Sequence, residues 1–562
     1  MTNSPADHTS ARFTSEQLER LKTYGTPHRA AAGQILYRPG QTGYDLVLVE
    51  SGRAEVVREG MDGTPPQVVA REGAGGILGE LSLLSRQAVY LTARMTAAGT
   101  IYRINPHELR RLMSADTELS AILLSTFMAR RRELQASAAR SLNLIGDDRT
   151  AAGLALRTYA ARLDLPHHWI HSRSPEGVSA MAEVEAGSSD LPLAITTAGV
   201  IGQATPGLLA ERLGLTYRIN DQDTSVDLVV VGAGPAGLAA TVYGASEGLT
   251  TTVLDAVGPG GQAAASSRIE NYLGFPEGLS GRDLLGRAHV QALKFGASVY
   301  SPCQVDSVIR TATGYTITLH DGARIAARVI IAATGARYRT LPIDRWHDFE
   351  GAGIYYAATE LETRRLAGLP VAVVGGANSA GQAAIFLASK GCTVDLVIRG
   401  TDIRSGMSAY LVDRILATPA ITVRTGTQVT ALHGTTFLTA VDYTLTSGKV
   451  AREQPASALF CFIGAAPASE WLDVAAQDEN GFVYTDSDVA GDHLGPAWSE
   501  LGRRPLPFET SSPRLFAVGD VRHGSMKRVA AAVGEGASAV ASAHAALAHD
   551  TPAHSLTTTP TG

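Results

Sequence analysis

Residues 227–240 read Asp227-Leu-Val-Val-Val-Gly-Ala-Gly-Pro-Ala-Gly-Leu-Ala-Ala240, an apolar run that passes into a glycine-rich turn and then into small helix-forming residues. This order is typical of a buried strand, a phosphate-binding turn and a helix. The glycines allow a tight turn, close approach of the backbone to a pyrophosphate, and contact between helix and strand. Asp255 ends the next predicted strand, 18 residues beyond Gly237. A carboxylate there can bind ribose hydroxyls, so the pattern predicts a dinucleotide site.

A second strand, turn and helix begin in Val371-Ala-Val-Val-Gly-Gly-Ala-Asn-Ser-Ala380. Here Ala377 and Ala380 occupy the second and third glycine positions. The next predicted strand ends in Arg399 rather than in an acid, and an arginine there suits the 2′-phosphate of NADP. Arg404 follows in the same loop, and a solvated strand-end charge is the alternative interpretation of Arg399. Two nucleotide sites in one chain are the simplest interpretation of the two turns.

Length and composition predict a globular protein of several domains. The chain has 562 residues, 45% of them hydrophobic and 18% charged, and at about 150 residues per domain three or four domains are expected. The net charge of −6 argues against a general nucleic-acid binder or a polybasic membrane binder. The first residues, 1–10, are polar and no run of 18 apolar residues predicts a transmembrane helix, so a cytoplasmic protein is expected. Cys303, Cys392 and Cys461 lie too far apart for a CxxC, a metal cluster or a disulfide framework.

Further motifs follow the two turns. They are Gly260-Gly-Gln262, Ile269-Glu-Asn-Tyr-Leu-Gly-Phe-Pro276, Ala333-Thr-Gly335, Phe462-Ile-Gly-Ala-Ala-Pro467 and Leu515-Phe-Ala-Val-Gly-Asp520. With these motifs in this order, residues 226–546 resemble the low-molecular-weight thioredoxin reductases. The resemblance implies two Rossmann-like, three-layer α/β domains: an FAD-binding domain in two segments, 221–337 and 464–548, and an inserted NAD(P)-binding domain at 338–463. It also favours a homodimer.

The resemblance implies a set of cofactor-binding residues. For FAD they are Gly232, Gly234, Pro235, Ala236, Gly237, Asp255, Gly261, Gln262, Asn271, Thr334, Gly335, Gly519, Asp520, Lys527, Arg528 and Val529. For NADPH they are Gly375, Gly376, Asn378, Ser379, Ala380, Arg399, Arg404 and Gly464. A helix that begins at Val529 can stabilise the anionic reduced flavin through its N-terminal amides.

The redox cysteines of that family have no counterpart here. Counting back from Gly375 without a gap places Ala358 and Leu361 at the family's CxxC positions, and thiol exchange requires a thiolate. We therefore expect an NAD(P)H-dependent FAD oxidoreductase that is not a dithiol thioredoxin reductase and that passes electrons to an unknown small-molecule or protein acceptor. Glu362 stands where the family keeps an acid, so it is the candidate catalytic residue, with a solvated carboxylate as the alternative. A redox- or nucleotide-sensing flavoprotein with little turnover is the alternative function.

The first region, residues 1–140, is rich in short strands separated by glycine turns and then becomes helical, which predicts a β-roll with helices. Its motifs are Gly33-Gln-Ile-Leu-Tyr-Arg-Pro-Gly40, Leu46-Val-Leu-Val-Glu-Ser-Gly52 and Leu78-Gly-Glu-Leu-Ser-Leu-Leu84. The region resembles a cyclic nucleotide-binding domain, and the resemblance implies Gly79, Glu80 and Arg86 as ligand-binding residues. Arg86 stands about two positions early, and Ala88 occupies the expected place of the arginine. Cyclic nucleotide binding and a role in docking or dimerisation therefore both stay open.

The second region, residues 141–220, alternates predicted helices and strands, which indicates a small α/β domain. Leu191-Pro-Leu-Ala-Ile195 resembles the strand of thioredoxin- or glutaredoxin-like proteins that carries a cis proline, with Pro192 in place. The cysteine motif of those proteins is missing near Asp147-Asp-Arg-Thr150, so the resemblance implies a degenerate thioredoxin-like domain. The last residues, 549–562, are rich in Thr and Pro and are expected to be a disordered tail.

Overall fold

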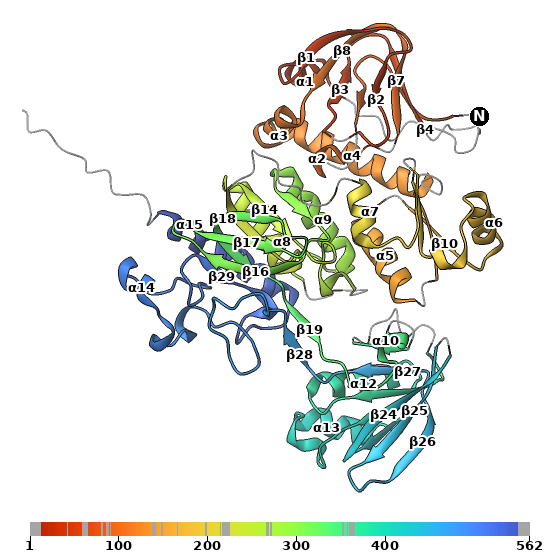
Figure 1. Cartoon of the computed structure of the whole chain (residues 1–562), viewed down its shortest axis with the longest axis vertical. Helices are drawn as coiled ribbons and strands as arrows, with labels where there is room; N and C mark the ends of the chain where they lie inside the picture. Colours follow the sequence, from red (N-terminus) through yellow and green to blue (C-terminus); the bar gives the residue numbers. More distant parts are fainter. Residues whose placement is uncertain are drawn as a thin grey trace, which may run out of the picture.

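The computed structural model describes residues 13–548, apart from residues 42, 59–65, 80–81, 86–88, 90, 138–141, 148–149, 164, 166, 197–198, 214, 216–224, 266–268, 270–271, 351–352, 357, 359–362, 364–365 and 436. Along the described chain an N-terminal domain and a middle domain precede a central domain, into which a further domain is inserted (Figure 1). The expected tail, residues 549–562, lies outside the described residues. Among the described helices, none combines the length and the apolar character that crossing a membrane requires.

The N-terminal domain is a roll of two antiparallel sheets in its described part, with strand orders β1-β8-β3-β6 and β2-β7-β4-β5. Its elements are α1 (Ser15–Lys22), β1 (Thr26–Ala30), β2 (Ile35–Tyr37), β3 (Leu46–Val49), β4 (Arg53–Arg58), β5 (Gln67–Glu72), β6 (Ile77–Leu78), α2 (Ser82–Ser85), β7 (Thr92–Ala97), β8 (Gly99–Ile104), α3 (Pro106–Ala115) and α4 (Thr117–Ser137). The helical stretch predicted beyond Pro106 is two helices, because Asp116 is extended after α3 and its carboxylate accepts from the Leu119 amide at 3.0 Å. The apolar side of α4 is core, since Leu123 and Phe127 are fully buried.

The middle domain is a mixed sheet with strand order β10-β9-β11-β12, in which β9 and β10 are parallel and the other pairs antiparallel. Its elements are β9 (Leu142–Gly146), α5 (Ala151–Arg162), β10 (His168–His171), α6 (Pro175–Glu183), β11 (Leu193–Thr196), β12 (Gly199–Ile201) and α7 (Pro206–Leu213). This order matches the helices and strands expected from the sequence. The Leu191–Pro192 peptide bond is cis.

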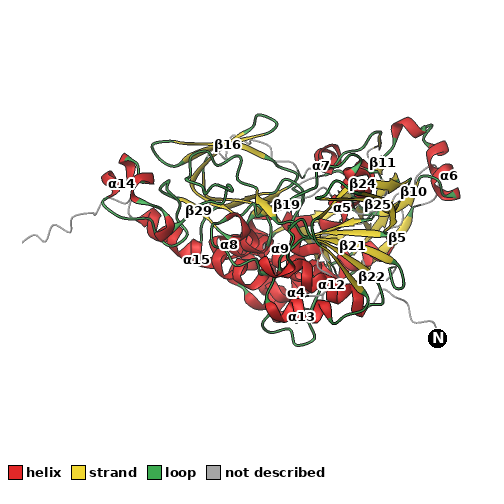
Figure 2. Cartoon of the chain, turned by 90° about the horizontal axis from the view of Figure 1, so that it is seen from below, coloured by secondary structure: helices red, strands yellow, loops and turns green. Residues whose placement is uncertain are grey.

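The central domain is built on the strand order β15-β14-β13-β18-β17-β16, with β29 on the second half of β18. Its elements are β13 (Val226–Val231), α8 (Pro235–Ser246), β14 (Thr251–Leu254), α9 (Gly281–Lys294), β15 (Ser298–Tyr300), β16 (Val305–Arg310), β17 (Tyr315–Leu319), β18 (Arg324–Ala332), α14 (Pro496–Leu501), β29 (Leu515–Ala517) and α15 (Val529–Ala548). The parallel strand β13 is nearly all apolar because helices and strands cover both of its faces. Helix α8 contacts both α9 and α15, and Figure 2 shows these helices gathered on one side with β16 on the other.

The inserted domain repeats this plan with the parallel strand order β20-β27-β21-β22-β23, next to the antiparallel strands β24-β25-β26. Its elements are α10 (Trp346–Phe349), β20 (Ile354–Tyr355), β21 (Pro370–Val374), α12 (Asn378–Ser389), β22 (Thr393–Val397), α13 (Ala409–Leu416), β23 (Ile421–Arg424), β24 (Thr427–Gly434), β25 (Leu438–Leu445), β26 (Val450–Pro455) and β27 (Ala458–Cys461). Two short paired strands, β19 (Ala336–Tyr338) and β28 (Ala465–Pro467), join it to the central domain (Figure 1). The two Rossmann-like units expected from the sequence are both present.

Candidate functional site

The first glycine-rich turn leaves no room for a side chain at its first and third glycines, Gly232 and Gly237. Gly232 has φ +103°, and a methyl group on it would lie 2.3 Å from the carbonyl oxygen of Ala333. A methyl group on Gly237 would lie 1.8 Å from the carbonyl oxygen of Gly232. Pro235 and Ala236 open α8, where a proline is tolerated because a first-turn amide has no helical partner. The sequence therefore placed this turn correctly, between β13 and α8.

Asp255 follows β14 and organises the turn. One carboxylate oxygen accepts from the Ala233 amide at 2.7 Å. The other accepts from the amides of Val257 at 2.9 Å and Gly258 at 2.6 Å. These bonds hold the glycine turn and the loop after β14 together at the carboxyl end of the sheet, where nucleotides bind in such folds. Asp255 thus lies at this edge with part of its acceptor capacity used by the backbone, and ribose binding by its carboxylate stays a prediction.

The loop of residues 258–262 packs against the same turn. A methyl group on Gly261 would lie 3.0 Å from Gly234 Cα. Gln262 donates through its side-chain amide to the carbonyl of Ala336, at the start of the connecting strand β19. Asn271, the other residue expected from this part of the sequence, lies outside the described residues.

The motif at the end of β18 meets the second connecting segment. Thr334 donates through its hydroxyl to the carbonyl of Ala468 at 2.6 Å, and Gly335 accepts from the Ala468 amide at 3.0 Å. Gly335 has φ +69°, a conformation that favours glycine. The Thr334–Gly335 pair therefore closes the junction between the central and inserted domains.

Asp520 follows β29 at the same edge of the sheet. No donor among the described residues reaches its carboxylate, and burial raises its pKa, with Lys527 opposing and Glu535 adding to the shift. A half-buried carboxylate in this state is suited to accept from hydroxyl groups of a ligand. Gly519 donates its amide to Glu535 at 2.6 Å, which anchors the motif to α15.

The predicted residues after this motif are solvent-accessible. Lys527 and Arg528 are exposed, and Lys527 lies over the ring of Phe482. Val529 is the first residue of α15, so the N-terminal amides of that helix begin where the sequence placed them. Helix α15 packs on α8 so tightly that a methyl group on Gly536 would lie 2.0 Å from the Ala236 carbonyl.

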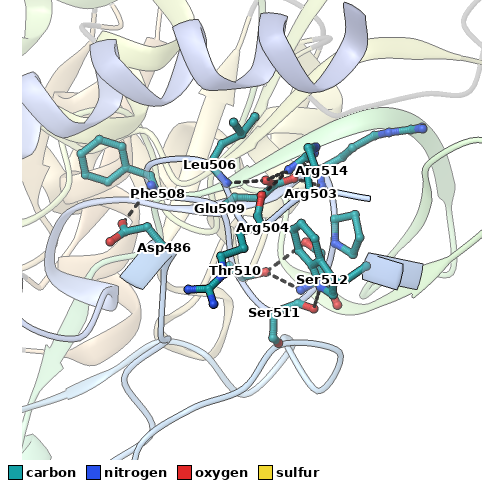
Figure 3. Close-up of polar contacts among 12 residues, drawn as sticks. Asp486, Arg503, Arg504, Leu506, Phe508, Glu509, Thr510, Ser511, Ser512 and Arg514 are labelled. Carbon is teal, nitrogen blue, oxygen red and sulfur yellow. Dashed lines mark hydrogen bonds and ion pairs between the residues drawn. The ribbon is translucent and has the colours of Figure 1, made fainter. Parts of the chain in front are cut away.

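Sequence reasoning missed the buried carboxylate of Glu509. It is fully buried and pairs with both terminal nitrogens of Arg503, at 2.6 and 2.9 Å. It also accepts from the amides of Leu506 and Arg514, each at 2.8 Å (Figure 3). The network fixes the loop that leads into β29 and so positions Asp520 indirectly. The available signal in the sequence was an acid just before a short apolar strand.

The second glycine-rich turn is more open than the first. A methyl group on Gly375 would lie 2.5 Å from the Phe462 carbonyl, so this glycine is required. Asn378 and Ser379 are exposed at the start of α12, while Ala380 is buried. Asn378 accepts through its side-chain oxygen from the Ser408 amide at 2.8 Å.

The predicted phosphate-binding arginines lie in one loop beside this turn. Arg399 is exposed directly after β22, and no described residue hydrogen-bonds or ion-pairs with it. Arg404 is 58% exposed and lies 4.0 Å from Asp413. The loop returns against the turn, since a methyl group on Gly406 would lie 2.8 Å from the Gly376 carbonyl. Gly464, also predicted, is exposed and its carbonyl accepts from the Arg339 amide at the junction.

A stacked tyrosine pair includes Tyr356, which lies two residues before Ala358, the first position expected for the redox cysteines. The rings of Tyr338 and Tyr356 are 5.1 Å apart and nearly parallel, at 3°. The Tyr356 hydroxyl donates to Glu350 and accepts from the Trp346 ring nitrogen at 2.9 Å. Burial and the nearby Asp520 carboxylate raise the pKa of Tyr338. Sequence reasoning did not anticipate this pair.

The three cysteines of the chain are buried and lie apart from one another. Cys303, Cys392 and Cys461 all lie in the described part of the chain, they are buried, and no disulfide joins them. Burial raises the pKa of Cys461 to about 11, so its thiol resists ionisation. Glu362, the candidate catalytic residue, lies outside the described residues.

In the N-terminal domain, one of the three predicted ligand-binding residues is described. Gly79 has φ +147°, and its carbonyl accepts from Arg130 of α4 at 2.8 Å. Arg130 also bonds to the Ile77 carbonyl at 3.0 Å and pairs with Glu72 at 2.6 Å. Glu80 and Arg86 lie outside the described residues. Helix α4 is therefore anchored to the segment expected to bind a cyclic nucleotide.

Comparisons with known proteins agree with this arrangement. Residues 226–536 match the family pattern described as pyridine nucleotide-disulphide oxidoreductase, and residues 27–116 match the cyclic nucleotide-binding domain. Thioredoxin reductase of Treponema pallidum (strain Nichols) is 31% identical over 327 residues, which make up 58% of this chain and 98% of that protein. NADPH-dependent thioredoxin reductase 3 of Arabidopsis thaliana is 29% identical over 325 residues, or 56% of this chain and 57% of that protein.

Among solved structures, the thioredoxin reductase of T. acidophilum is 27% identical, with 57% of this chain and 98% of that chain covered and a TM-score of 0.46. The family pattern spans more than half of the present chain and covers both glycine-rich turns. The protein therefore belongs to the pyridine nucleotide-disulphide oxidoreductase family, with thioredoxin reductase-like nucleotide-binding domains behind an N-terminal cyclic nucleotide-binding domain.

Proposed function

We propose that the protein is an NADPH-dependent FAD oxidoreductase whose electrons leave the flavin for an acceptor other than a CxxC dithiol. The observation that carries the proposal is the combination of two strand, glycine-rich turn and helix units with three separated, buried cysteines. A thiol relay requires an accessible thiolate next to a second thiol. Neither requirement is met, while the residues for both nucleotides are present.

The residues of the central domain fit FAD. Asp255 and the turn at Gly232–Gly237 suit the adenosine diphosphate end, because backbone amides at a helix N-terminus favour phosphate oxygens. The Asp520 carboxylate, without a donor in the described chain, suits hydroxyl groups of the ribityl chain. When bound, FAD supplies a carrier that accepts a hydride from NADPH and returns two electrons to an acceptor. The start of α15 at Val529 adds partial positive charge near this end of the site.

The inserted domain fits NADPH. Arg399 is an exposed guanidinium with no partner in the described chain, and it stands where a 2′-phosphate is recognised in this type of fold. The loop that carries Arg399 and Arg404 packs on the turn at Gly376. The thioredoxin reductase relative from Arabidopsis thaliana is named as NADPH-dependent, which supports the same cofactor choice.

An anaerobic NADPH titration followed by absorption tests the proposal. We expect the purified protein to contain a flavin that bleaches on addition of NADPH and recovers its absorption with a small quinone, ferricyanide or oxygen. Oxidised thioredoxin and an aromatic disulfide are expected to leave the flavin reduced. A Cys461→Ser variant is expected to behave like the wild type. Rapid thioredoxin reduction that is lost in a cysteine variant would refute the absence of a dithiol route.

We further propose that the N-terminal domain modulates this reaction through α9. Leu293 of α9 belongs to the hydrophobic core of the N-terminal domain, and α9 also contacts the loop that begins at Gln262. Arg130 bonds to the Gly79 carbonyl, and its neighbour Arg131 acts electrostatically on His289 of α9. Burial, together with the charge of Arg131, lowers the pKa of His289 to about 4. His289 is therefore neutral at physiological pH, which allows it to lie against the cation. The same contacts of α9 with both domains also support the alternative function, a sensor with little turnover, because they connect the N-terminal domain to the predicted flavin site.

Cyclic nucleotides and one interface variant separate these possibilities. Leu293→Ala is expected to change the rate of NADPH oxidation without changing flavin content, because Leu293 packs in the hydrophobic core of the N-terminal domain. Cyclic AMP or cyclic GMP that shifts the melting temperature and the rate would identify the modulator. A bound flavin that NADPH fails to reduce would favour the sensor over the enzyme.

We infer that the middle domain is thioredoxin-like without its cysteines. The cis bond before Pro192 and the order of helices and strands support this inference. The protein is also expected to be a homodimer, which analytical ultracentrifugation of the full chain tests.

A further inference from the structure

Helix α5 of the middle domain contacts the loops that follow β14 and β15. The fully buried Tyr159 donates through its hydroxyl to the carbonyl of Ser301 at 2.8 Å, which ties α5 to the central domain. Arg162, the last residue of α5, lies on the loop after Asp255. A methyl group on Gly258 would lie 3.3 Å from Arg162 Cβ and 3.6 Å from its Cδ. The middle domain thus brings an arginine to the loop that holds the predicted ribose acid.

Arg162 carries a half-buried guanidinium whose only nearby carboxylate among the described residues is that of Asp255. Within the described part of the chain, no group hydrogen-bonds to its guanidinium or forms an ion pair with it. Burial lowers its pKa, and the nearby Asp255 carboxylate raises it. The oxygens of Asp255 are already engaged by three backbone amides. A partly desolvated guanidinium is costly without hydrogen-bond acceptors, so this arrangement is suited to a ligand that supplies them.

We propose that Arg162 binds the adenosine diphosphate half of FAD, so that the middle domain completes the cofactor site of the central domain. The proposal rests on the proposed function, which assigns FAD to the turn beside Asp255. That half of FAD offers a purine face for a planar guanidinium and phosphate oxygens for its N–H groups. A cation here also offsets the repulsion between the Asp255 carboxylate and a diphosphate.

The middle domain lies outside residues 226–536, the part of the chain that matches the oxidoreductase family. Arg162 is therefore an addition to the cofactor site made by this chain's own domain arrangement. It acts as a cofactor-binding residue and takes no part in hydride transfer.

Equilibrium binding of FAD to the full-length apoprotein tests the proposal. Flavin fluorescence is expected to show a dissociation constant about tenfold to a hundredfold higher for Arg162→Gln than for the wild type, as for loss of a charge-assisted hydrogen bond. ADP, which carries the half of FAD in question, is expected to compete with FAD less well in the variant by a similar factor. Riboflavin, which lacks the adenosine and both phosphates, is expected to compete equally with FAD in both proteins.

Three further variants keep the test decisive. Arg173→Gln removes a charge from a mostly exposed side chain of the same domain and is expected to bind FAD like the wild type. Tyr159→Phe loosens the docking of α5 without touching the charge, so equal effects of Tyr159→Phe and Arg162→Gln would assign Arg162 a structural role and overturn the proposal. Where Arg162→Gln does not fold, Arg162→Lys decides, because unchanged FAD and ADP affinity without the planar group would overturn it. A wild-type apoprotein that binds no FAD would instead refute the proposed function.

Discussion

The two glycine-rich turns of this protein share one backbone plan and differ in how firmly they are enclosed. The first turn is closed by Asp255, which accepts three backbone amides, and by α15, which packs on α8. The second turn ends in the exposed Arg399 and presents Asn378 and Ser379 to solvent. An enclosed turn is suited to a resident cofactor, and an open turn beside a guanidinium that has no partner among the described residues is suited to a nucleotide that must enter and leave. The same strand, turn and helix are therefore enclosed to different degrees at the two places in the chain, and the predictions below test whether the two turns differ in what they bind.

The largest expected effect is that of a methyl group in the enclosed turn. Gly237→Ala would place Cβ 1.8 Å from the Gly232 carbonyl oxygen, and such overpacking costs about 1–3 kcal/mol or more. We expect loss of bound flavin and a large fall in melting temperature. The matched change in the open turn, Ala380→Gly, is expected to cost about 1 kcal/mol or less. Similar melting temperatures for the two variants would contradict the comparison.

The next largest effect on stability is expected from replacing Asp255, the acid that follows β14, in comparison with Arg399, which follows β22. Asp255→Ala leaves the buried Ala233 amide without its acceptor, which costs about 1–3 kcal/mol, and it also weakens flavin retention. Arg399→Ala at the corresponding place is expected to leave the unfolding free energy unchanged, because Arg399 is exposed and has no bond in the described chain. Urea unfolding of both variants measures the difference. Equal destabilisation would show that the second strand end is as enclosed as the first.

Cofactor discrimination sharpens the comparison on the open side. Arg399→Ala is expected to raise the KM for NADPH by about tenfold to a hundredfold, the effect of losing a charge-assisted hydrogen bond. The KM for NADH is expected to change little, since NADH lacks the 2′-phosphate. Steady-state kinetics with ferricyanide measures both constants, with the exposed Arg452→Ala as control. Equal effects on the two nucleotides would exclude Arg399 as the phosphate-binding residue.

The smallest effect is a pH dependence in the apoprotein. Burial raises the folded-state pKa of Asp520 above the unfolded value, so the folded protein binds this proton more tightly. Stability from this group is therefore greatest at acid pH and declines as the pH rises from about 3.9 through the raised pKa. Apo Asp520→Asn is expected to melt above apo wild type at neutral pH, with the gap closing at low pH.

A difference in melting temperature between the two apoproteins that widens toward acid pH would contradict this prediction. The exposed Asp473→Asn serves as control and is expected to melt like the wild type. Flavin binding by Asp520→Asn is expected to weaken. The carboxylate would then destabilise the apoprotein at neutral pH and yet contribute to cofactor binding.

Much of the fold was readable along the chain. The turns at Gly232 and Gly375 were found because an apolar strand before them and small residues after them leave few other conformations. The element order of the middle domain followed from the same alternation of patterns. The break at Asp116 was missed, because the apolar spacing continues across it while the backbone does not. Glu509 was missed because an acid before a strand is ordinarily a surface residue, and only the fold surrounds it with four donors.

The sequence by itself determined the two glycine-rich turns, the lack of a CxxC, the N-terminal cyclic nucleotide-binding domain and the oxidoreductase domains, because these depend on residues that are close together in the chain. The tertiary structure decided which distant residues meet. It placed Leu293 in the core of the N-terminal domain, stacked Tyr338 on Tyr356, and brought Arg162 to the loop after Asp255. Such contacts depend on how whole domains dock, and docking is set by surface shape and charge summed over many residues, which no local pattern records.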